Sequence, residues 1–234
     1  MNLFLQKVIT DDGVTYNITK GGYFLGIVLI LIALLVVSYF TNKDDKAKMS
    51  VKQLTFSAIC LAIAFVLSNI KLFKLPMGGS VTIISMFFVT YIGYLYGPRV
   101  GLSAAISYGF LQLLVDPYII SIPQLFCDYI LAFGALGLSG FFYNKKHGMT
   151  IGYIVGVFGR FVFAVLSGVI FFSAYAEGSG HTPLVYSILY NGSYLSVELA
   201  MTLVIIAIPA VHKALNYVKQ AANEKTLKNQ VSLG

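Results

Sequence analysis

The sequence predicts an all-α integral membrane protein with seven membrane-spanning helices. The chain has 234 residues, of which 58% are hydrophobic and only 11% are charged, whereas soluble domains carry about 25% charged residues. Seven apolar stretches account for most of the length, and three charged residues fall inside them: Asp128, Arg160 and Glu198. A charge in hydrocarbon costs at least about 2.5–3.5 kcal/mol, so we expect these side chains to face a protein interior or a wet cavity.

The first apolar stretch, residues 22–40, carries no charge and is about one bilayer long at roughly 1.5 Å per residue. A hydrophilic linker with four lysines and two aspartates follows at 41–52. Every span should be helical, because backbone polar groups in lipid must be satisfied within the segment. The later spans are expected at 53–69, 81–97, 100–115, 123–142, 150–175 and 183–210.

The first span looks separable from the other six. The later spans are richer in Gly, Ser, Tyr and Asn, and small residues let helices approach closely in lipid. We therefore expect a six-helix bundle plus one extra N-terminal transmembrane helix. The predicted parts are an extracellular segment (1–21), the extra helix (22–40), a cytoplasmic linker (41–52), the substrate-binding bundle (53–211) and a cytoplasmic tail (212–234).

The distribution of basic residues between loops predicts the orientation, because cytoplasmic loops carry an excess of Lys and Arg. One set of loops holds Lys43, Lys46, Lys48, Lys52, Arg99, Lys145, Lys146, Lys213, Lys219, Lys225 and Lys228. The opposite set holds Lys7, Lys20, Lys71 and Lys74. The N-terminus is therefore expected outside the cell and the C-terminus in the cytoplasm.

Several function classes are disfavoured. The net charge of +7 does not indicate nucleic-acid binding, because the basic residues lie between apolar runs and form no patch with interleaved aromatics. Cys60 and Cys127 lie in apolar segments and are interpreted as small core residues, not as a disulfide or a metal site. The chain has no P-loop, H-E-x-x-H or G-x-S-x-G motif, so neither an ATPase nor an enzyme is expected.

The loop Lys74–Thr82 (KLPMGGSVT) joins two predicted spans. Its proline and its paired glycines are incompatible with regular helix. It is either a simple turn or a loop in which Gly79 and Ser80 let the backbone approach a ligand closely.

An acid and two tyrosines follow in the outer half of the bundle. Pro123 suits the first turn of a helix, which sets Asp128 about a turn and a half inside its outer end. Asp128 either faces a ligand cavity open to the exterior or pairs with a helix N-terminus. Tyr118 and Tyr129 flank it, and a buried acid beside aromatic rings suggests a cationic aromatic ligand.

The last span presents Tyr186, Tyr190 and Tyr194 on one helical face, because they recur at i, i+4 and i+8. Asn191 lies nearer the face of Tyr194 and must find polar partners inside the bundle. It either joins two helices or contacts a ligand.

Arg160 and Glu198 both fall near mid-membrane and are opposite in sign. A structural ion pair is the first expectation, because an unpaired buried charge is very costly. A proton or ion relay is the alternative, although no histidine lies inside a span. In the second span, Ala58 and Ala62 lie four residues apart and make a flat helical face, either for packing within the bundle or for docking a partner.

Taken together, these residues resemble the thiamine-specific substrate-binding (S) subunits of energy-coupling factor (ECF) vitamin transporters. The resemblance covers about residues 53–218. It rests on Leu75-Pro-Met-Gly-Gly-Ser-Val-Thr82, Pro123-Gln-Leu-Phe-Cys-Asp128-Tyr129 with Leu131-Ala-Phe, Ser167-Gly-Val-Ile-Phe-Phe-Ser-Ala-Tyr-Ala176 and Tyr186-Ser-Ile-Leu-Tyr-Asn191.

The resemblance implies a six-helix bundle that takes thiamine from outside, without a cofactor or metal, in a bacterial plasma membrane. It implies a transmembrane coupling subunit and two cytoplasmic ATPases as partners. The pocket residues it implies are Asp128, Tyr129, Tyr118, Tyr186, Asn191 and Phe172, with the lid loop at Gly78–Ser80 and the docking pair at Ala58 and Ala62.

The chain departs from the family pattern at one pocket position. Many members carry a histidine four residues after a basic position, and here Ala164 stands four residues after Arg160. The expected function is thiamine binding for an ECF importer. The alternatives are an S subunit for a related compound, such as the pyrimidine precursor of thiamine, and a solitary ion-coupled transporter.

Overall fold

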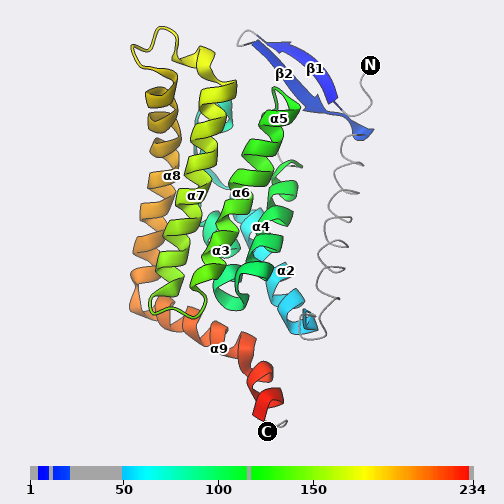
Figure 1. Cartoon of the computed structure of the whole chain (residues 1–234), viewed down its shortest axis with the longest axis vertical. Helices are drawn as coiled ribbons and strands as arrows, with labels where there is room; N and C mark the ends of the chain where they lie inside the picture. The colour runs from blue at the N-terminus through cyan, green and yellow to red at the C-terminus, as the bar shows by residue number, and fades with distance from the viewer. Residues whose placement is uncertain (1–4, 11–12, 22–48, 115–116, 232–234) are drawn as a thin grey trace.

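The computed structural model describes residues 5–10, 13–21, 49–114 and 117–231. The expected extra helix at 22–40 lies outside these residues, as does most of the linker. Each of the six later spans corresponds to a helical segment (Figure 1). The single helices are α2 (Val51–Ser68), α3 (Ser85–Tyr96), α4 (Pro98–Gln112), α7 (Gly148–Phe171) and α8 (Pro183–Ala207). The segment 122–142 comprises α5 (Ile122–Leu125), η2 (Phe126–Leu131), α6 (Ala132–Gly134) and η3 (Ala135–Phe142).

Local sequence sets where these helices begin. Ser50 and Gln53 form a reciprocal capping box at the start of α2, with Gln53 N–H donating to Ser50 Oγ over 3.1 Å. Thr182 accepts from the Val185 N–H over 3.4 Å at the start of α8, where Pro183 occupies the first turn. Such caps satisfy backbone donors that the helix itself leaves without partners.

The all-α prediction is incomplete, because the structure contains two antiparallel hairpins. The first joins β1 (Leu5–Thr10) to β2 (Gly13–Ile18). The second joins β3 (Lys71–Lys74) to β4 (Ser80–Thr82) through the 3₁₀ turn η1 (Pro76–Gly78), and we call residues 71–82 the flap hairpin. The expected span at 81–97 therefore begins later, with α3 at Ser85.

Glycine allows the central helices to approach one another closely. A Cβ atom on Gly137 would lie 2.5 Å from the Cα of Leu102 in α4, and one on Gly93 would lie 2.4 Å from Ser139 Oγ. Neither space admits a side chain. In the gap between α3 and η3, the Ser139 hydroxyl donates to the Thr90 carbonyl over 2.8 Å. The sequence thus builds a tightly packed helical interior, as small residues do in membrane bundles.

Four helical segments among the described residues are long and apolar enough to cross a bilayer: Val51–Ser68, Ile122–Phe142, Gly148–Phe171 and Pro183–Ala207. α3 and α4 have only 12 and 15 residues, fewer than the roughly 20 that a span requires. Nine residues of α3 are buried, so this helix lies within the bundle. The mostly helical membrane architecture is confirmed, whereas the count of seven spans stays a prediction.

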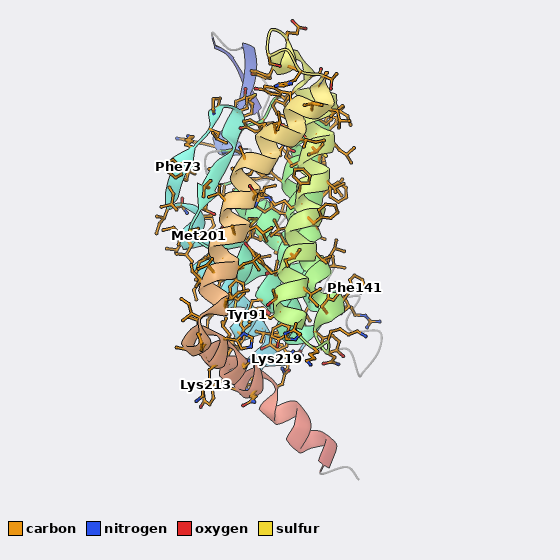
Figure 2. All side chains as sticks on the ribbon, turned by 90° about the vertical axis from the view of Figure 1, so that its left-hand side faces the viewer. Phe73, Tyr91, Phe141, Met201, Lys213 and Lys219 are labelled. Atoms are coloured by element: carbon orange, nitrogen blue, oxygen red, sulfur yellow. The ribbon has the colours of Figure 1, made fainter. Side chains whose placement is uncertain are left out.

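The outer surface of the bundle is apolar. Phe158 on α7 and Val204 on α8 are 63% and 68% exposed, and Phe141 and Phe73 also project outward (Figure 2). Large exposed apolar side chains on several helices suit contact with lipid chains rather than water.

The C-terminal tail is helical in its described part. α8 ends at Ala207, Ile208 is extended, and Pro209 begins α9 (Pro209–Val231), which crosses the end of the bundle (Figure 1). Tyr91 of α3 donates to the Leu215 carbonyl over 2.5 Å, and Lys219 lies 3.5 Å above the Tyr94 ring. The basic tail therefore packs against the end of the bundle opposite Phe73 of the flap hairpin (Figure 2).

Candidate ligand-binding site

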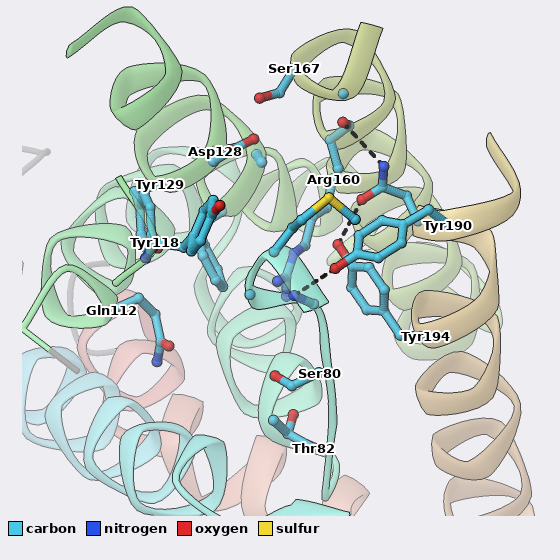
Figure 3. A pocket seen from close by; sticks show the side chains of 18 of the residues that line it. Ser80, Thr82, Gln112, Tyr118, Asp128, Tyr129, Arg160, Ser167, Tyr190 and Tyr194 are labelled. Carbon is cyan, nitrogen blue, oxygen red and sulfur yellow. Dashed lines mark hydrogen bonds between the residues drawn. The ribbon is translucent and has the colours of Figure 1, made fainter. Parts of the chain in front are cut away.

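One cavity contains all eight residues that the sequence predicts as ligand contacts. Its walls come from the flap hairpin, the segment 117–133, α7 and α8 (Figure 3). The predicted residues that line it are Gly79, Ser80, Tyr118, Asp128, Tyr129, Phe172, Tyr186 and Asn191. Segments distant in sequence thus converge on one space, and their individual contacts indicate what each can do.

Asp128 lies in η2, where the helix is π-helical. Such turns insert extra backbone into a helix and are frequent at functional sites. The Gln124 amide donates to Asp128 Oδ2 over 2.6 Å and to the Tyr118 carbonyl over 3.1 Å. The Gln124 side-chain oxygen also accepts from the Ile120 N–H over 3.2 Å. Gln124 is 1% exposed, so this network fixes the carboxylate in one orientation at the cavity wall.

Aromatic rings form the wall next to Asp128. The Tyr118 and Phe172 ring centroids are 6.0 Å apart, and Phe172 and Tyr175 are 6.2 Å apart. The hydroxyls of Tyr118 and Tyr175 share a hydrogen bond of 3.0 Å. Tyr129 accepts from the Tyr118 N–H over 2.9 Å. These contacts hold several ring faces beside a carboxylate, an arrangement suited to a flat cation.

The opposite wall is the tyrosine face of α8. Tyr186 and Tyr190 stack with centroids 6.4 Å apart and planes 12° apart. Asn191 donates to the Ala164 carbonyl of α7 over 3.3 Å and accepts from the Tyr194 hydroxyl over 2.8 Å. Two roles were considered for Asn191, and the structure shows that it joins α7 to α8. The same residue also borders the cavity.

Tyr190 binds the turn of the flap hairpin from α8. Its hydroxyl accepts from the Gly79 N–H over 3.0 Å and donates to the Pro76 carbonyl. A Cβ atom on Gly79 would lie 2.6 Å from that hydroxyl oxygen, so the contact requires glycine there. The adjoining Gly78 has a φ of +90°, which also favours glycine. The loop is therefore more than a simple turn, because its backbone approaches α8 over the cavity.

Among the described residues, no salt bridge or hydrogen bond joins Arg160 to Glu198, so the expected ion pair does not form. Glu198 accepts four hydrogen bonds, from Thr82 N–H (3.1 Å), Thr82 Oγ1 (2.7 Å), Ser85 Oγ (3.3 Å) and Met86 N–H (3.3 Å). The Arg160 guanidinium lies 4.0 Å above the Phe133 ring. The flap hairpin and the first turn of α3 supply the donors that the carboxylate needs. Both charged residues border the cavity, with separate partners.

Ala58 and Ala62 are exposed on α2, whereas Ser57, Cys60 and Ala64 are buried. The alanine pair therefore faces away from the bundle and away from the cavity. Their spacing allowed two interpretations, packing within the bundle or docking to a partner. Because both side chains are exposed, they do not pack within the bundle.

A family model described as Thiamine transporter protein (Thia_YuaJ) matches residues 54–218. The chain belongs to this thiamine transporter family. The thiamine transporter ThiT of Bacillus subtilis (strain 168) is 32% identical over 154 residues, covering 59% of this chain and 79% of that protein. The structure of ThiT from Listeria monocytogenes matches with a TM-score of 0.57 and 29% identity, covering 67% of this chain and 91% of that one.

These relatives are transporters and not enzymes, in agreement with the lack of catalytic motifs in the sequence. The family match covers the predicted bundle and leaves the N-terminal fifty residues outside it. Both relatives come from bacteria, and the apolar helices of this chain suit a multi-pass membrane protein.

Three residues of this thiamine transporter homologue gained a role only from the structure. Gln124 orients Asp128, Tyr190 binds the flap hairpin, and Ser167 borders the cavity from α7. The spacing of Gln124 and Asp128, one helical turn apart, is a signal that could have linked them. The i, i+4, i+8 tyrosine pattern placed Tyr190 on a shared face without indicating its hydrogen-bond partners.

Proposed function

We propose that this chain is the substrate-binding subunit of an ECF-type importer that binds thiamine from the extracellular side. The observation that carries the proposal is a fixed carboxylate, Asp128, beside aromatic rings in a cavity beneath a flap hairpin. Membership of the thiamine transporter family supports the same ligand.

Thiamine has two rings that suit this cavity. Its thiazolium ring carries a fixed positive charge, and its aminopyrimidine ring offers an amino group and ring nitrogens. Asp128 can offset the charge or accept from the amino group. Tyr118, Phe172 and Tyr186 offer ring faces, while Asn191 and Ser80 offer polar atoms at the wall.

Release to the cytoplasm requires partners in this proposal. The sequence contains no P-loop, so ATP would be hydrolysed by two separate ATPases acting through a transmembrane coupling subunit. The exposed Ala58 and Ala62 form the proposed docking face, since small side chains allow close helix contact in lipid. We place the N-terminus outside and the C-terminus inside, because cytoplasmic loops carry an excess of Lys and Arg. Lys52 donates to the Ala221 carbonyl of α9, and Lys219 of α9 donates to the Tyr143 carbonyl, so both lysines lie at the end of the bundle where α9 packs.

Ligand identification tests the proposal directly. Mass spectrometry of the purified chain should detect co-purifying thiamine, and isothermal titration calorimetry should give saturable binding at one thiamine per chain. Binding of the pyrimidine precursor in preference to thiamine would favour the related-compound alternative, which the alanine at position 164 raises. Failure to bind either compound would overturn the assignment.

A transport assay separates the importer from a solitary transporter. Liposomes that contain this chain alone should not accumulate thiamine, whereas those that also contain the coupling subunit and ATPases should do so with ATP. Ion-driven accumulation by this chain alone would refute the importer proposal. The hydrogen bonds of Glu198 to the flap hairpin give that residue a structural task and weaken the case for an ion-coupling role.

A further inference from the structure

Ser167 presents an unsatisfied hydroxyl to the cavity. This residue of α7 is 1% exposed, and its Oγ has no hydrogen-bond partner among the described residues. Three other buried oxygens in the described part of the chain share this property, on Ser57, Tyr96 and Thr202. None of those three residues borders the cavity, whereas Ser167 does. A buried polar atom without a partner is costly, so one in a binding cavity indicates a partner supplied by the ligand.

The helix itself cannot easily satisfy this hydroxyl. A helical serine normally donates to the carbonyl three or four residues earlier, as Ser103 does to Arg99 over 2.9 Å. For Ser167 these carbonyls belong to Ala164 and Phe163. The Asn191 amide already donates to the first over 3.3 Å, and Cys127 Sγ donates to the second over 3.5 Å.

Both carbonyls also lie inside α7, where each accepts the ordinary helix hydrogen bond. Their two lone pairs are therefore already used. The Cys127 and Asn191 contacts come from two different neighbouring segments, so this local geometry directs the Ser167 hydroxyl away from its own backbone.

The hydroxyl lies beside the proposed ligand acid. Figure 3 shows the Ser167 side chain and the Asp128 carboxylate turned toward the same part of the cavity. Gln124 donates to Oδ2 of Asp128, and each carboxylate oxygen can accept more than one hydrogen bond. Ala164, on the same wall of α7, offers only a methyl group. Ser167 is thus the polar group that α7 brings next to the Asp128 carboxylate, close enough to interact with it.

We propose that Ser167 is a specificity-determining residue that, with Asp128, binds the amino edge of a nitrogen heterocycle. Asp128 accepts from the exocyclic amino group, and the Ser167 hydroxyl donates to the adjacent ring nitrogen. This inference rests on the proposed function, because the aminopyrimidine ring of thiamine has this edge. It assigns Asp128 a hydrogen bond to that ring. A site built on two such hydrogen bonds rejects analogues that lack the matching groups.

The test is calorimetric titration of the purified full chain with two ligands, thiamine and an analogue in which oxygen replaces the pyrimidine amino group. Ser167→Ala should weaken thiamine binding about tenfold, the effect of one lost hydrogen bond. It should weaken binding of the analogue less, so the preference for thiamine falls. Thr202→Val is the matched control, because it removes an equally buried unsatisfied hydroxyl outside the cavity and should change affinity less than twofold.

Each outcome is decisive. Equal thiamine affinity for wild type and Ser167→Ala, or equal losses for both ligands, would overturn the role of Ser167 while leaving thiamine binding intact. A lower melting temperature of unliganded Ser167→Ala than of Thr202→Val would indicate a structural role and also overturn it. If the wild type does not bind thiamine, the proposed function fails first.

Discussion

The contacts of Glu198 predict that Glu198→Gln will destabilise the protein strongly. Two donors face each carboxylate oxygen, and each pair includes one backbone N–H, from Thr82 or Met86. Glutamine has one oxygen and one NH₂ group. Whichever way the amide is turned, one buried backbone N–H faces another donor and loses its acceptor.

The magnitude follows from these contacts. A buried donor without an acceptor costs about 1–3 kcal/mol, and hydrogen bonds to a charged group contribute about 1.5–3 kcal/mol each. Because some bonds survive in weakened form, we expect a total loss of about 3–5 kcal/mol, the range for breaking a buried charged cluster. For a chain of this size that corresponds to a decrease in melting temperature of about 10 °C.

The assay is thermal unfolding of the purified protein in detergent, followed by a thiol-reactive dye that reports exposure of Cys60, which is buried and free. Glu177→Gln is the matched control, because Glu177 is exposed and its substitution should change stability by less than about 0.5 kcal/mol. Equal melting temperatures for the two variants would refute the inference that Glu198 holds the flap hairpin to α8.

Two further substitutions probe the flap hairpin and the docking face. Tyr190→Phe removes the hydroxyl that contacts Gly79 and Pro76, so hydrogen exchange of the 77–80 backbone amides should accelerate about tenfold. Unchanged exchange would mean that the hydroxyl does not hold the loop. Ala58→Leu enlarges the exposed alanine face and should leave thiamine affinity within about twofold while transport by the reconstituted complex falls about tenfold or more. Normal transport by that variant would remove this face from the docking surface.

Residue patterns predicted much of the bundle, because apolar length is a local signal, whereas the family resemblance was needed to name some of the residues that line the cavity, such as Phe172. The length of the apolar stretches located the helices. The high cost of a charge in lipid indicated that Asp128 faces a protein interior or a cavity. The flap hairpin was harder to predict. Pro76 and the paired glycines excluded helix there, but the strands around them are only four and three residues long. The hairpin also contacts Tyr190 and Glu198 of α8, and no local pattern encodes these long-range contacts.

The ion pair failed as a prediction for a related reason. Arg160 and Glu198 have opposite charges and similar predicted depths, but no sequence pattern indicates that Thr82, Ser85 and Met86 surround the carboxylate. Ser167 was equally inaccessible to sequence reasoning. A serine in a membrane helix ordinarily bonds its own backbone, and only the structure reveals that Cys127 and Asn191 occupy the available carbonyls.

The most direct test of the account is a calorimetric comparison of thiamine binding by wild type, Asp128→Asn and the control Glu177→Gln. A desolvated acid that pairs with the ligand predicts a loss of about 2–5 kcal/mol for Asp128→Asn, which is about thirtyfold to several thousandfold in Kd, and no change for the control. Unchanged affinity in Asp128→Asn would contradict the claim that this carboxylate binds the ligand.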